Sequence, residues 1–172
     1  MVNQIKSKIR SIKNWPKKGV IFRDITPVLQ DKKLFKTLIN ELAKPYLKSK
    51  IDIVVGIDAR GFLLASGVAY KLGTGLALVR KKGKLPYKTV SKKYVLEYAS
   101  NTLEMHKDAI KKGQKVLLID DVLATGGTME ATVALVEKLG GRICGIVFLI
   151  ELDFLKGRDK IKKYPVKSLI HY

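Results

Sequence analysis

Short apolar runs recur along the chain, and each is rich in Val, Ile and Leu. Runs of this kind, four to eight residues long, are typical of strands that are buried on both faces of a sheet. They cover residues 51–56, 76–79, 116–119 and 143–150, and residues 168–170 form a last, shorter candidate. The pattern therefore predicts a central sheet whose strands are spaced widely along the sequence.

Apolar residues at helical spacing separate these runs. Leucines recur every four residues in 31–48, where Asp31 is a candidate N-cap and Pro45 should bend or restart the helix. The same spacing predicts helices over 62–72 and from residue 129 to the glycines at 140–141. Because strands alternate with helices, we expect an α/β fold with a parallel-sheet core flanked by helices, in one domain over 1–172.

The N-terminal part departs from this alternation. Apolar residues at helical spacing predict a short amphipathic helix over 2–12, and residues 14–19 break it. Residues 20–27 look extended and end at Pro27. On the pattern alone, this extended part is a connector whose aromatic side chains pack on the core.

Residues 80–106 are too long for a simple connection between a strand and a helix. Tyr94, Leu96 and Tyr98 alternate with their neighbours, and the tip of the segment is rich in Lys, Ser and Asn. A segment of this length in a compact domain is usually functional, and a lid that excludes water from a site is one such role. The alternative is a β-hairpin, for instance at a dimer interface.

Candidate chemistry is concentrated in residues 116–132. The apolar run is followed by two carboxylates, Asp120 and Asp121, then by the small residues of 124–128, then by a helix. Glycines let backbone N–H groups approach a ligand, and a helix N-terminus adds unpaired donors and partial positive charge. The loop is therefore a candidate phosphate cradle, and the carboxylates fit a neighbouring diol or a metal ion. A ribose phosphate carries both hydroxyls and a phosphate.

Two common phosphate motifs are absent from the sequence. It contains neither the Gly-x-x-x-x-Gly-Lys-Ser/Thr of a P-loop nor a Gly-x-Gly-x-x-Gly after a strand. An ordinary turn between strand and helix is the plain alternative. The order of apolar strand, paired acids and Thr-Gly-Gly-Thr instead closely resembles the phosphoribosyl-pyrophosphate motif of the phosphoribosyltransferases, which binds the ribose diol and the 5′-phosphate.

The resemblance extends over nearly the whole chain. Order and spacing are similar to those of the adenine branch of the type I phosphoribosyltransferase family at GVIFRDITPVLQD (19–31), GIDARGF (56–62), VRKKGKLP (79–86), LEYASNTLEMHKDAI (96–110) and IDDVLATGGT (119–128). The resemblance implies the type I phosphoribosyltransferase fold, with an N-terminal hood segment over about 1–30 and a long flexible lid loop over about 82–106. It also implies a homodimer.

The family reaction joins adenine to phosphoribosyl pyrophosphate in the presence of Mg²⁺ and releases AMP and pyrophosphate. The resemblance therefore implies a purine-salvage enzyme, a pentosyltransferase of the glycosyltransferase class. The ribose carbon gains oxocarbenium character as pyrophosphate leaves, so catalysis should depend on positioning and charge stabilisation. Mg²⁺ should be held mainly through substrate and water, with no direct protein ligand.

The resemblance also assigns roles to individual residues. The catalytic residues would be Glu97, which takes the proton that the adenine ring nitrogen loses, and Arg60. The ribose diol and 5′-phosphate would be bound by Asp120, Asp121, Ala124, Thr125, Gly126, Gly127 and Thr128. Pyrophosphate would be bound by Asp58, Ala59, Arg60, Arg80, Lys84 and Tyr98, with a cis peptide between the first two. As alternatives, Arg60 is a surface ion-pair partner, Lys84 a solvated lysine and Glu97 a plain hairpin charge.

The choice of base depends on Ala124 and on an extended N-terminal segment. Family members that act on 6-oxopurines typically have an aspartate at the position of Ala124, whereas the adenine enzymes have alanine there. The adenine-binding segment of the family corresponds to Ile21, Phe22 and Arg23. A backbone carbonyl at Arg23 would accept a hydrogen bond from the 6-amino group, and Phe22 would pack near the base. A pyrimidine or another 6-aminopurine is the alternative within this class.

The chain of 172 residues carries a formal net charge of +19, and most of its cations are lysines. Three explanations of this charge are open: a lysine-biased composition, steering of an anionic substrate, and nucleic-acid binding. Because the lysines are dispersed and the chain has no room for an added DNA-binding domain, we do not expect nucleic acid as a partner. A nucleic-acid-binding regulator that keeps this fold and motif is the alternative from another functional class.

The sequence also bears on the cellular compartment. No apolar run approaches the roughly 20 residues of a membrane helix, and the N-terminus lacks the apolar core of a signal peptide. The single cysteine, Cys144, lies in an apolar run and is expected to be a buried thiol. We therefore expect a cytoplasmic protein without membrane association.

Overall fold

The computed structural model describes residues 1–96 and 99–172, which divide into two compact units, 1–41 and 42–172. The N-terminal unit has a two-stranded antiparallel sheet, formed by β1 and β2, and short helices. Its elements are α1 (Val2–Lys8), β1 (Arg10–Lys13), β2 (Ile21–Asp24), α2 (Thr26–Gln30) and most of α3 (Lys32–Ala43). Buried side chains of this unit include Ile5, Ile25, Val28 and Leu38.

The helix predicted over 2–12 is too long. It ends at Lys8, Ile9 is extended (φ −68°, ψ 123°), and Arg10 begins β1. Arg10 lies opposite Asp24 of β2, and its Nη1 is 3.3 Å from Asp24 Oδ2. The helical spacing of apolar residues continues to residue 12, but pairing of β1 with β2 ends the helix at Lys8.

The extended segment predicted over 20–27 is shorter than expected, because β2 ends at Asp24 and α2 begins at Thr26. Asp24 Oδ1 accepts hydrogen bonds from the backbone N–H (2.9 Å) and the hydroxyl (2.7 Å) of Thr26. Asp31 caps α3 as predicted, since its Oδ1 accepts two backbone N–H groups of the first turn at 2.9 and 3.1 Å. The restart predicted at Pro45 is the 3₁₀ turn η1 (Lys44–Tyr46), which directly follows α3.

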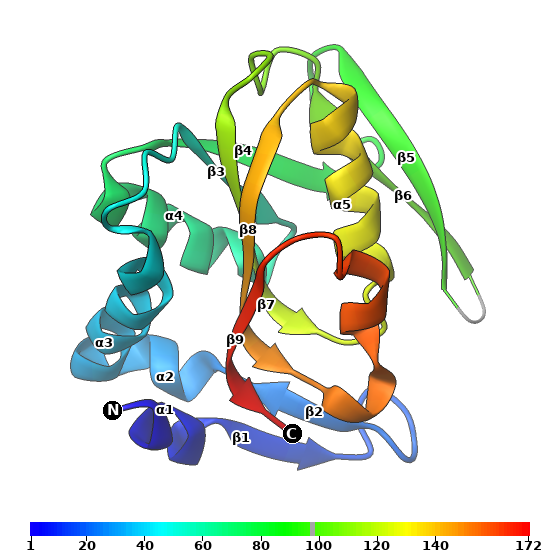
Figure 1. Ribbon diagram of the computed structural model, residues 1–172. Coiled ribbons are helices and arrows are strands. Elements are labelled where there is room, and N and C mark those ends of the chain that lie inside the picture. Colours follow the sequence, from blue (N-terminus) through cyan, green and yellow to red (C-terminus); the bar gives the residue numbers. More distant parts are fainter. Residues whose placement is uncertain (97–98) are drawn as a thin grey trace. The chain divides into compact units, whose positions relative to one another are not determined.

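The described residues of the larger unit form a sheet of seven strands in the order β5-β6-β4-β3-β7-β8-β9 (Figure 1). The five strands from β4 to β9 in this order are parallel, and β6 and β5 extend the sheet in antiparallel pairing. The strands are β3 (Ile53–Ile57), β4 (Gly75–Lys81), β5 (Thr89–Leu96), β6 (Ala99–His106), β7 (Lys115–Leu123), β8 (Arg142–Glu151) and β9 (Val166–His171). This arrangement confirms the predicted α/β fold with a parallel core.

Two helices cover opposite faces of this sheet, α4 (Arg60–Leu72) and α5 (Gly127–Lys138) (Figure 1). Alternate residues of β3 point to the two faces. Val55 belongs to a buried cluster with Met129 and Leu135 of α5. On the other face, a Cβ at Gly56 would lie 2.7 Å from the Cβ of Ala65 in α4. Because α4 follows β3 and α5 follows β7 in the chain, the N-termini of both helices lie at the carboxyl edge of the parallel strands. Ligands bind at this edge in such sheets.

The predicted lid region is a β-hairpin in the described residues. Strands β5 and β6 pair from Thr89–His106 to Leu96–Ala99, and β6 joins the sheet opposite Arg80 of β4. Glu97 and Tyr98, which follow β5 in the chain, lie outside the described residues. Closure of this hairpin over a site stays a prediction.

Two further expectations need correction. The strand predicted over 116–119 is longer, because β7 pairs with β8 as far as Leu123 and so includes both acids. Cys144 is partly exposed rather than buried, and its Sγ is 3.5 Å from the carbonyl oxygen of Arg142. The continuously buried part of β8 begins only at Gly145. Separately, no helix in the described part of the chain is long and apolar enough to cross a membrane.

Candidate active site

An acid pair and an arginine meet at the carboxyl edge of the sheet. Asp120 and Asp121 lie near the end of β7, and Arg60 is the first residue of α4. Arg60 Nε lies 2.8 Å from Asp121 Oδ2, and Asp120 Oδ1 accepts the backbone N–H of Asp121 at 2.8 Å. Asp121 is 6% exposed, whereas the side chain of Arg60 is partly exposed. The parallel pairing of β3 with β7 brings together residues that are distant in sequence.

The acid pair is held at some electrostatic cost. Burial raises the pKa of Asp120 well above its usual value, the adjacent Asp121 carboxylate raises it further, and Arg60 acts in the opposite direction. Burial also raises the pKa of Asp121, against the effect of Arg60. The pair therefore binds a proton more readily than two exposed aspartates would. A cation or the hydroxyl donors of a diol would favour the charged form instead.

Gly61 allows α4 to begin directly against β7. A Cβ at this position would lie 2.7 Å from Asp120 Oδ1 and 3.2 Å from the carbonyl oxygen of Ile119. The sequence motifs gave no role to Gly61. The available signal was a glycine directly before a predicted helix, a position where glycine permits close approach of the backbone to a neighbouring segment.

The segment that leads into α4 carries a second charged contact. The peptide between Asp58 and Ala59 is cis, as predicted. Asp58 Oδ2 lies 3.1 Å from Nε of Arg80, whose Nη1 donates to the carbonyl oxygen of Lys84 at 3.1 Å. The Arg80 guanidinium also lies 5.9 Å from the ring centre of Phe62. The candidates for pyrophosphate binding in 58–60 and 80–84 are thus linked, and the Lys84 side chain is exposed.

Glu104 supports the turn that carries Lys84. This glutamate is 9% exposed, and its Oε2 accepts the backbone N–H of Gly83 at 2.9 Å. It lies opposite Arg80 in the pairing of β4 with β6. Its role was not visible in the sequence, because an acid in an alternating strand is typical of an exposed face.

The small-residue loop forms a hollow at the N-terminus of α5. Gly126 has a positive φ of 80°, and no side chain of the described residues caps the helix. A cavity of about 140 Å³ opens here; it is lined by Asp120, Val122, Leu123, Ala124, Thr125, Gly126, Gly127, Thr128, Met129 and Phe148. Uncapped backbone N–H groups that face a cavity at a helix N-terminus are suited to bind an anion.

The hairpin reaches this hollow through β5. Thr128 Oγ1 donates a long hydrogen bond of 3.5 Å to the hydroxyl of Tyr94. The hairpin is therefore anchored beside the candidate cradle. Glu97 and Tyr98, which the sequence analysis assigned to catalysis and pyrophosphate binding, follow in the chain but lie outside the described residues, and their roles stay predictions.

The candidate adenine-binding residues belong to the N-terminal unit. Ile21, Phe22 and Arg23 are the first three residues of β2. The ring of Trp15 packs edge-on against Phe22 with 4.4 Å between ring centres, and Ile21 is 47% exposed. This unit is described by itself, so the contact of these residues with a base stays a prediction.

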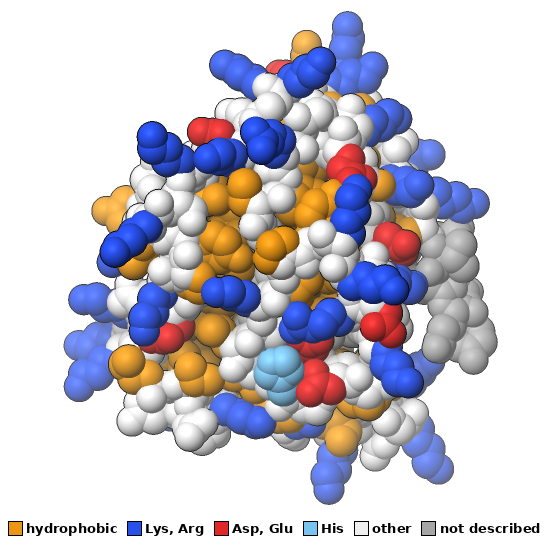
Figure 2. Space-filling view, in the orientation of Figure 1, with side chains coloured by type: hydrophobic (Ala, Val, Ile, Leu, Met, Phe, Trp, Pro, Cys, Tyr) orange, Lys and Arg blue, Asp and Glu red, His pale blue; other side chains and the backbone are white. Residues whose placement is uncertain are grey.

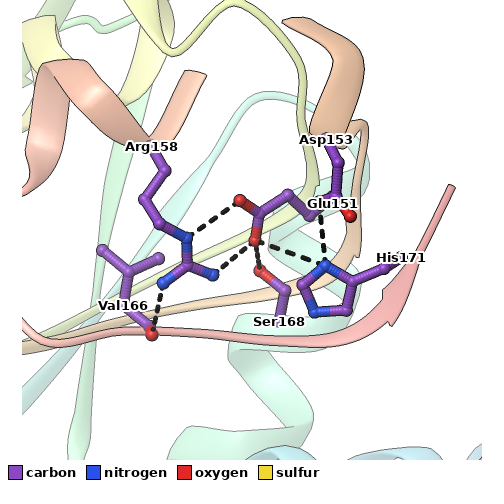
Figure 3. Close-up of polar contacts among 6 residues, drawn as sticks. All are labelled: Glu151, Asp153, Arg158, Val166, Ser168 and His171. Carbon is purple, nitrogen blue, oxygen red and sulfur yellow. Dashed lines mark hydrogen bonds and ion pairs between the residues drawn. The ribbon is translucent and has the colours of Figure 1, made fainter. Parts of the chain in front are cut away.

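Another polar cluster lies at the ends of β8 and β9 (Figure 3). Ligand atoms of Glu151, Asp153 and His171 lie within 4.8 Å of one another, a spacing compatible with a metal ion. However, Glu151 accepts hydrogen bonds from Arg158 and Ser168. Since its oxygens are engaged and a guanidinium adjoins them, this cluster is a poor candidate for Mg²⁺.

Comparisons with known proteins extend over both units. A model of the Phosphoribosyl transferase domain family matches residues 28–171. The adenine phosphoribosyltransferase of Brachyspira hyodysenteriae is 55% identical over 169 residues, which cover 98% of this chain and 99% of the relative. A crystal structure of adenine phosphoribosyltransferase from Thermoanaerobacter pseudethanolicus is 50% identical, with a TM-score of 0.97 and full coverage of both chains.

A further solved structure carries ligands. It is the adenine phosphoribosyltransferase of Saccharomyces cerevisiae, complexed with an imino-altritol bisphosphate and adenine. It is 38% identical, has a TM-score of 0.93, and the match covers 98% of this chain and 97% of that one.

Proposed function

This chain belongs to the phosphoribosyltransferase family, and on that premise we propose that it makes AMP and pyrophosphate from adenine and phosphoribosyl pyrophosphate in purine salvage. The observation that carries the proposal is 55% identity to an adenine phosphoribosyltransferase over almost the whole chain. The geometry supports it, because a buried acid pair and an arginine lie beside an anion cradle. The enzyme is thus a pentosyltransferase.

The 5′-phosphate binds in the loop 124–128. Support comes from the positive φ of Gly126, the uncapped start of α5 and the cavity at this point. The backbone N–H groups and the helix dipole compensate the phosphate charge without a lysine in the loop. The hydroxyls of Thr125 and Thr128 add donors.

The ribose hydroxyls donate to Asp120 and Asp121, which lie directly before the loop on β7. Hydroxyl donors favour the ionised form of carboxylates whose pKa is raised by burial, so the diol and the acid pair are complementary. Pyrophosphate lies toward Arg60, Arg80 and Lys84. Asp58 and Ala59, directly before Arg60, and Tyr98 also contribute to its binding. The two arginines stabilise the negative charge that develops on the leaving group.

Mg²⁺ assists the reaction and is held mainly by substrate oxygens and water. The donor set fits this arrangement, because Asp121 is already paired with Arg60 and Asp120 accepts a backbone hydrogen bond. The acid pair is therefore better suited to bind water on the metal than the metal itself. When bound, Mg²⁺ neutralises part of the pyrophosphate charge.

Adenine is read by Ile21, Phe22 and Arg23, and Glu97 accepts the proton that the ring nitrogen loses. Support for a 6-aminopurine comes from Ala124, since a carboxylate at this position is typical of the 6-oxopurine enzymes. The Trp15 ring against Phe22 supports a preformed aromatic face for the base.

The enzyme acts as a homodimer in the cytoplasm. Support for self-association comes from exposed apolar side chains on α4 and β4: Leu63 is 46%, Leu76 41% and Leu78 36% exposed. Light scattering on the purified protein tests this assembly, and a monomeric mass at micromolar concentration would contradict it.

The function is tested by pyrophosphate release with phosphoribosyl pyrophosphate and Mg²⁺, with adenine, hypoxanthine, guanine and uracil offered in parallel. Turnover with adenine alone is expected, and it should stop when the metal is chelated. Activity with hypoxanthine or guanine but not adenine would overturn the role of Ala124.

Absence of turnover with every base, in folded protein, would favour the nucleic-acid-binding regulator. The net charge of +19 is the observation behind that alternative. On the face in Figure 2, Lys and Arg side chains are spread out, with apolar and acidic side chains between them. A dispersed charge favours composition or substrate steering over a nucleic-acid site. A steep salt dependence of RNA or DNA affinity would support the regulator instead.

A further inference from the structure

An ion pair outside the substrate-binding residues joins the buried Glu151 to Arg158, which is partly exposed (Figure 3). Glu151, the last residue of β8, is 4% exposed. Arg158 binds it with two donors, since Nε lies 2.9 Å from Oε1 and Nη2 lies 2.5 Å from Oε2. Ser168 Oγ donates to Oε2 at 2.6 Å. Such a forked arrangement fixes geometry more strictly than a single contact between point charges does.

The same guanidinium joins three segments of the chain. Glu151 belongs to β8, and Arg158 itself lies in the 3₁₀ helix η3 (Gly157–Ile161). Arg158 Nη1 also donates to the carbonyl oxygen of Val166, the first residue of β9, at 2.9 Å. The pair therefore holds η3 against the ends of two strands.

The segment held in this way lies against the phosphate loop. A Cβ at Gly126 would lie 2.3 Å from the carbonyl oxygen of Gly157, and a Cβ at Gly157 would lie 2.0 Å from the carbonyl oxygen of Ala124. The two stretches thus touch backbone to backbone, with no space for a side chain at either glycine. The segment between Glu151 and Arg158 also contacts β7, since Leu152 N donates to the carbonyl oxygen of Leu123 at 2.9 Å.

Resting on the proposed function, we propose that Arg158 is a positioning residue for the substrate phosphate. Through its pair with Glu151 it holds Gly157 against residues 124–126, and this contact sets the direction of the loop N–H groups before substrate arrives. A site that is organised in advance loses less free energy on binding than a mobile loop. Loss of the pair should therefore weaken binding of the phosphoribosyl substrate and leave adenine binding nearly unchanged.

A purely structural role for the pair makes a different prediction. Lower stability alone reduces the active fraction, so kcat falls while the KM values of both substrates stay the same. A positioning role changes one KM selectively. The ratio of the two KM values therefore separates the two roles.

The first experiment compares Arg158→Met and Arg158→Lys with the wild type. The methionine keeps the apolar stem and removes every donor, whereas lysine keeps the charge and loses the fork. We expect the KM for phosphoribosyl pyrophosphate to rise roughly tenfold or more with Met and less with Lys, since misplaced groups lose most of their binding advantage. The KM for adenine should stay within about twofold of the wild type.

Lys163→Met is the matched control. It removes a cation in the same part of the chain, where Lys163 Nζ lies 2.9 Å from Glu137 Oε1 in an exposed pair. This pair does not involve Gly157 or the loop 124–126, so both KM values should equal those of the wild type. Thermal melting of each variant reports the folded fraction.

The second experiment measures binding of ribose 5-phosphate by calorimetry, without turnover. We expect weaker binding to Arg158→Met and to Gly157→Ala than to the wild type and Lys163→Met. If Arg158→Met does not fold, Glu151→Gln provides the same comparison, because it removes the charge from the pair and leaves Gly157 in place. An unchanged KM for phosphoribosyl pyrophosphate and unchanged ribose 5-phosphate affinity in folded variants would overturn the inference. Failure of the wild type to use adenine would instead reject the proposed function, and the binding experiment would still test the role of Arg158.

Discussion

Acids lie near the carboxyl ends of two neighbouring strands of the sheet, and their pKa values are shifted in opposite directions. At the end of β7, burial raises the pKa values of Asp120 and Asp121. At the end of β8, hydrogen bonds from Arg158 lower the pKa of Glu151 despite its burial. At Asp120 and Asp121 burial is the largest cause of the pKa shift, whereas at Glu151 the hydrogen bonds from Arg158 outweigh burial. The balance between burial and the donors supplied to each carboxylate decides the direction of the pKa shift.

The difference corresponds to two roles at one sheet edge. Glu151 receives a forked guanidinium and a hydroxyl. Asp120 and Asp121 are adjacent like charges, and Arg60 acts on both. The second arrangement costs stability and leaves acceptor capacity for a substrate, as is common where binding sites carry perturbed groups. Under the proposal above, the pair of Glu151 with Arg158 supports the loop 124–128, and the acid pair directly precedes this loop in the chain.

The largest expected effect comes from removing the cation on the β7 side. Arg60→Met should lower kcat/KM for phosphoribosyl pyrophosphate by about 10²–10³-fold, because an oriented charge in a catalytic site is worth this much. It should also leave Asp121 without its guanidinium at 2.8 Å. Steady-state kinetics with Lys163→Met as control measures the effect, and a loss below about tenfold would contradict a direct role for Arg60.

Asp120→Asn should have a smaller effect, which lowers turnover and raises stability. Turnover should fall roughly 10- to 100-fold, because a charged acceptor for the ribose hydroxyl becomes neutral. Stability should rise. The pKa of Asp120 is raised in the folded state, so its ionisation destabilises the fold. This cost is absent in acid and becomes complete as the pH rises through the raised pKa.

The stability gain of Asp120→Asn should therefore be present near neutral pH and shrink in acid. Thermal melting of both proteins at about pH 7.5 and about pH 4.5 checks the trend against the usual aspartate range. An equal or lower melting temperature of the variant at the higher pH would argue that the acid pair costs the fold nothing.

The smallest effect is expected on the β8 side, with the opposite sign. Glu151→Gln should destabilise the protein by about 1–2 kcal/mol near neutral pH, because Arg158 keeps only a neutral partner and is itself partly exposed. The pKa of Glu151 is lowered from its usual 4.5. Its contribution is therefore present above that value and lost as the pH falls through the lowered pKa.

Urea unfolding of wild type and Glu151→Gln across this acidic range measures the contribution. The two stabilities should converge in acid and differ at neutral pH. A variant as stable as the wild type at neutral pH would mean that the two strand ends do not differ as their pKa directions indicate.

The sequence by itself determined the features that depend on neighbours along the chain. Period and run length predicted the alternation of strands and helices, and single residues predicted the Asp31 cap and the restart at Pro45. The order of strand, acids and small-residue loop located the cradle, because all of its parts lie within 116–128. Resemblance to a family added the cis peptide and the approach of Arg60 to the site region.

Only the tertiary structure decided the features that depend on residues far apart. Strand β1 replaced the end of a predicted helix because Arg10 pairs with Asp24, and β7 extended through its acids because β8 continues beside it. The contact of Gly157 with the loop, and the pair that holds it, have no local pattern at all. Burial, ion pairing and backbone contact depend on packing between segments. The periodicity of one segment does not indicate which other segment packs against it.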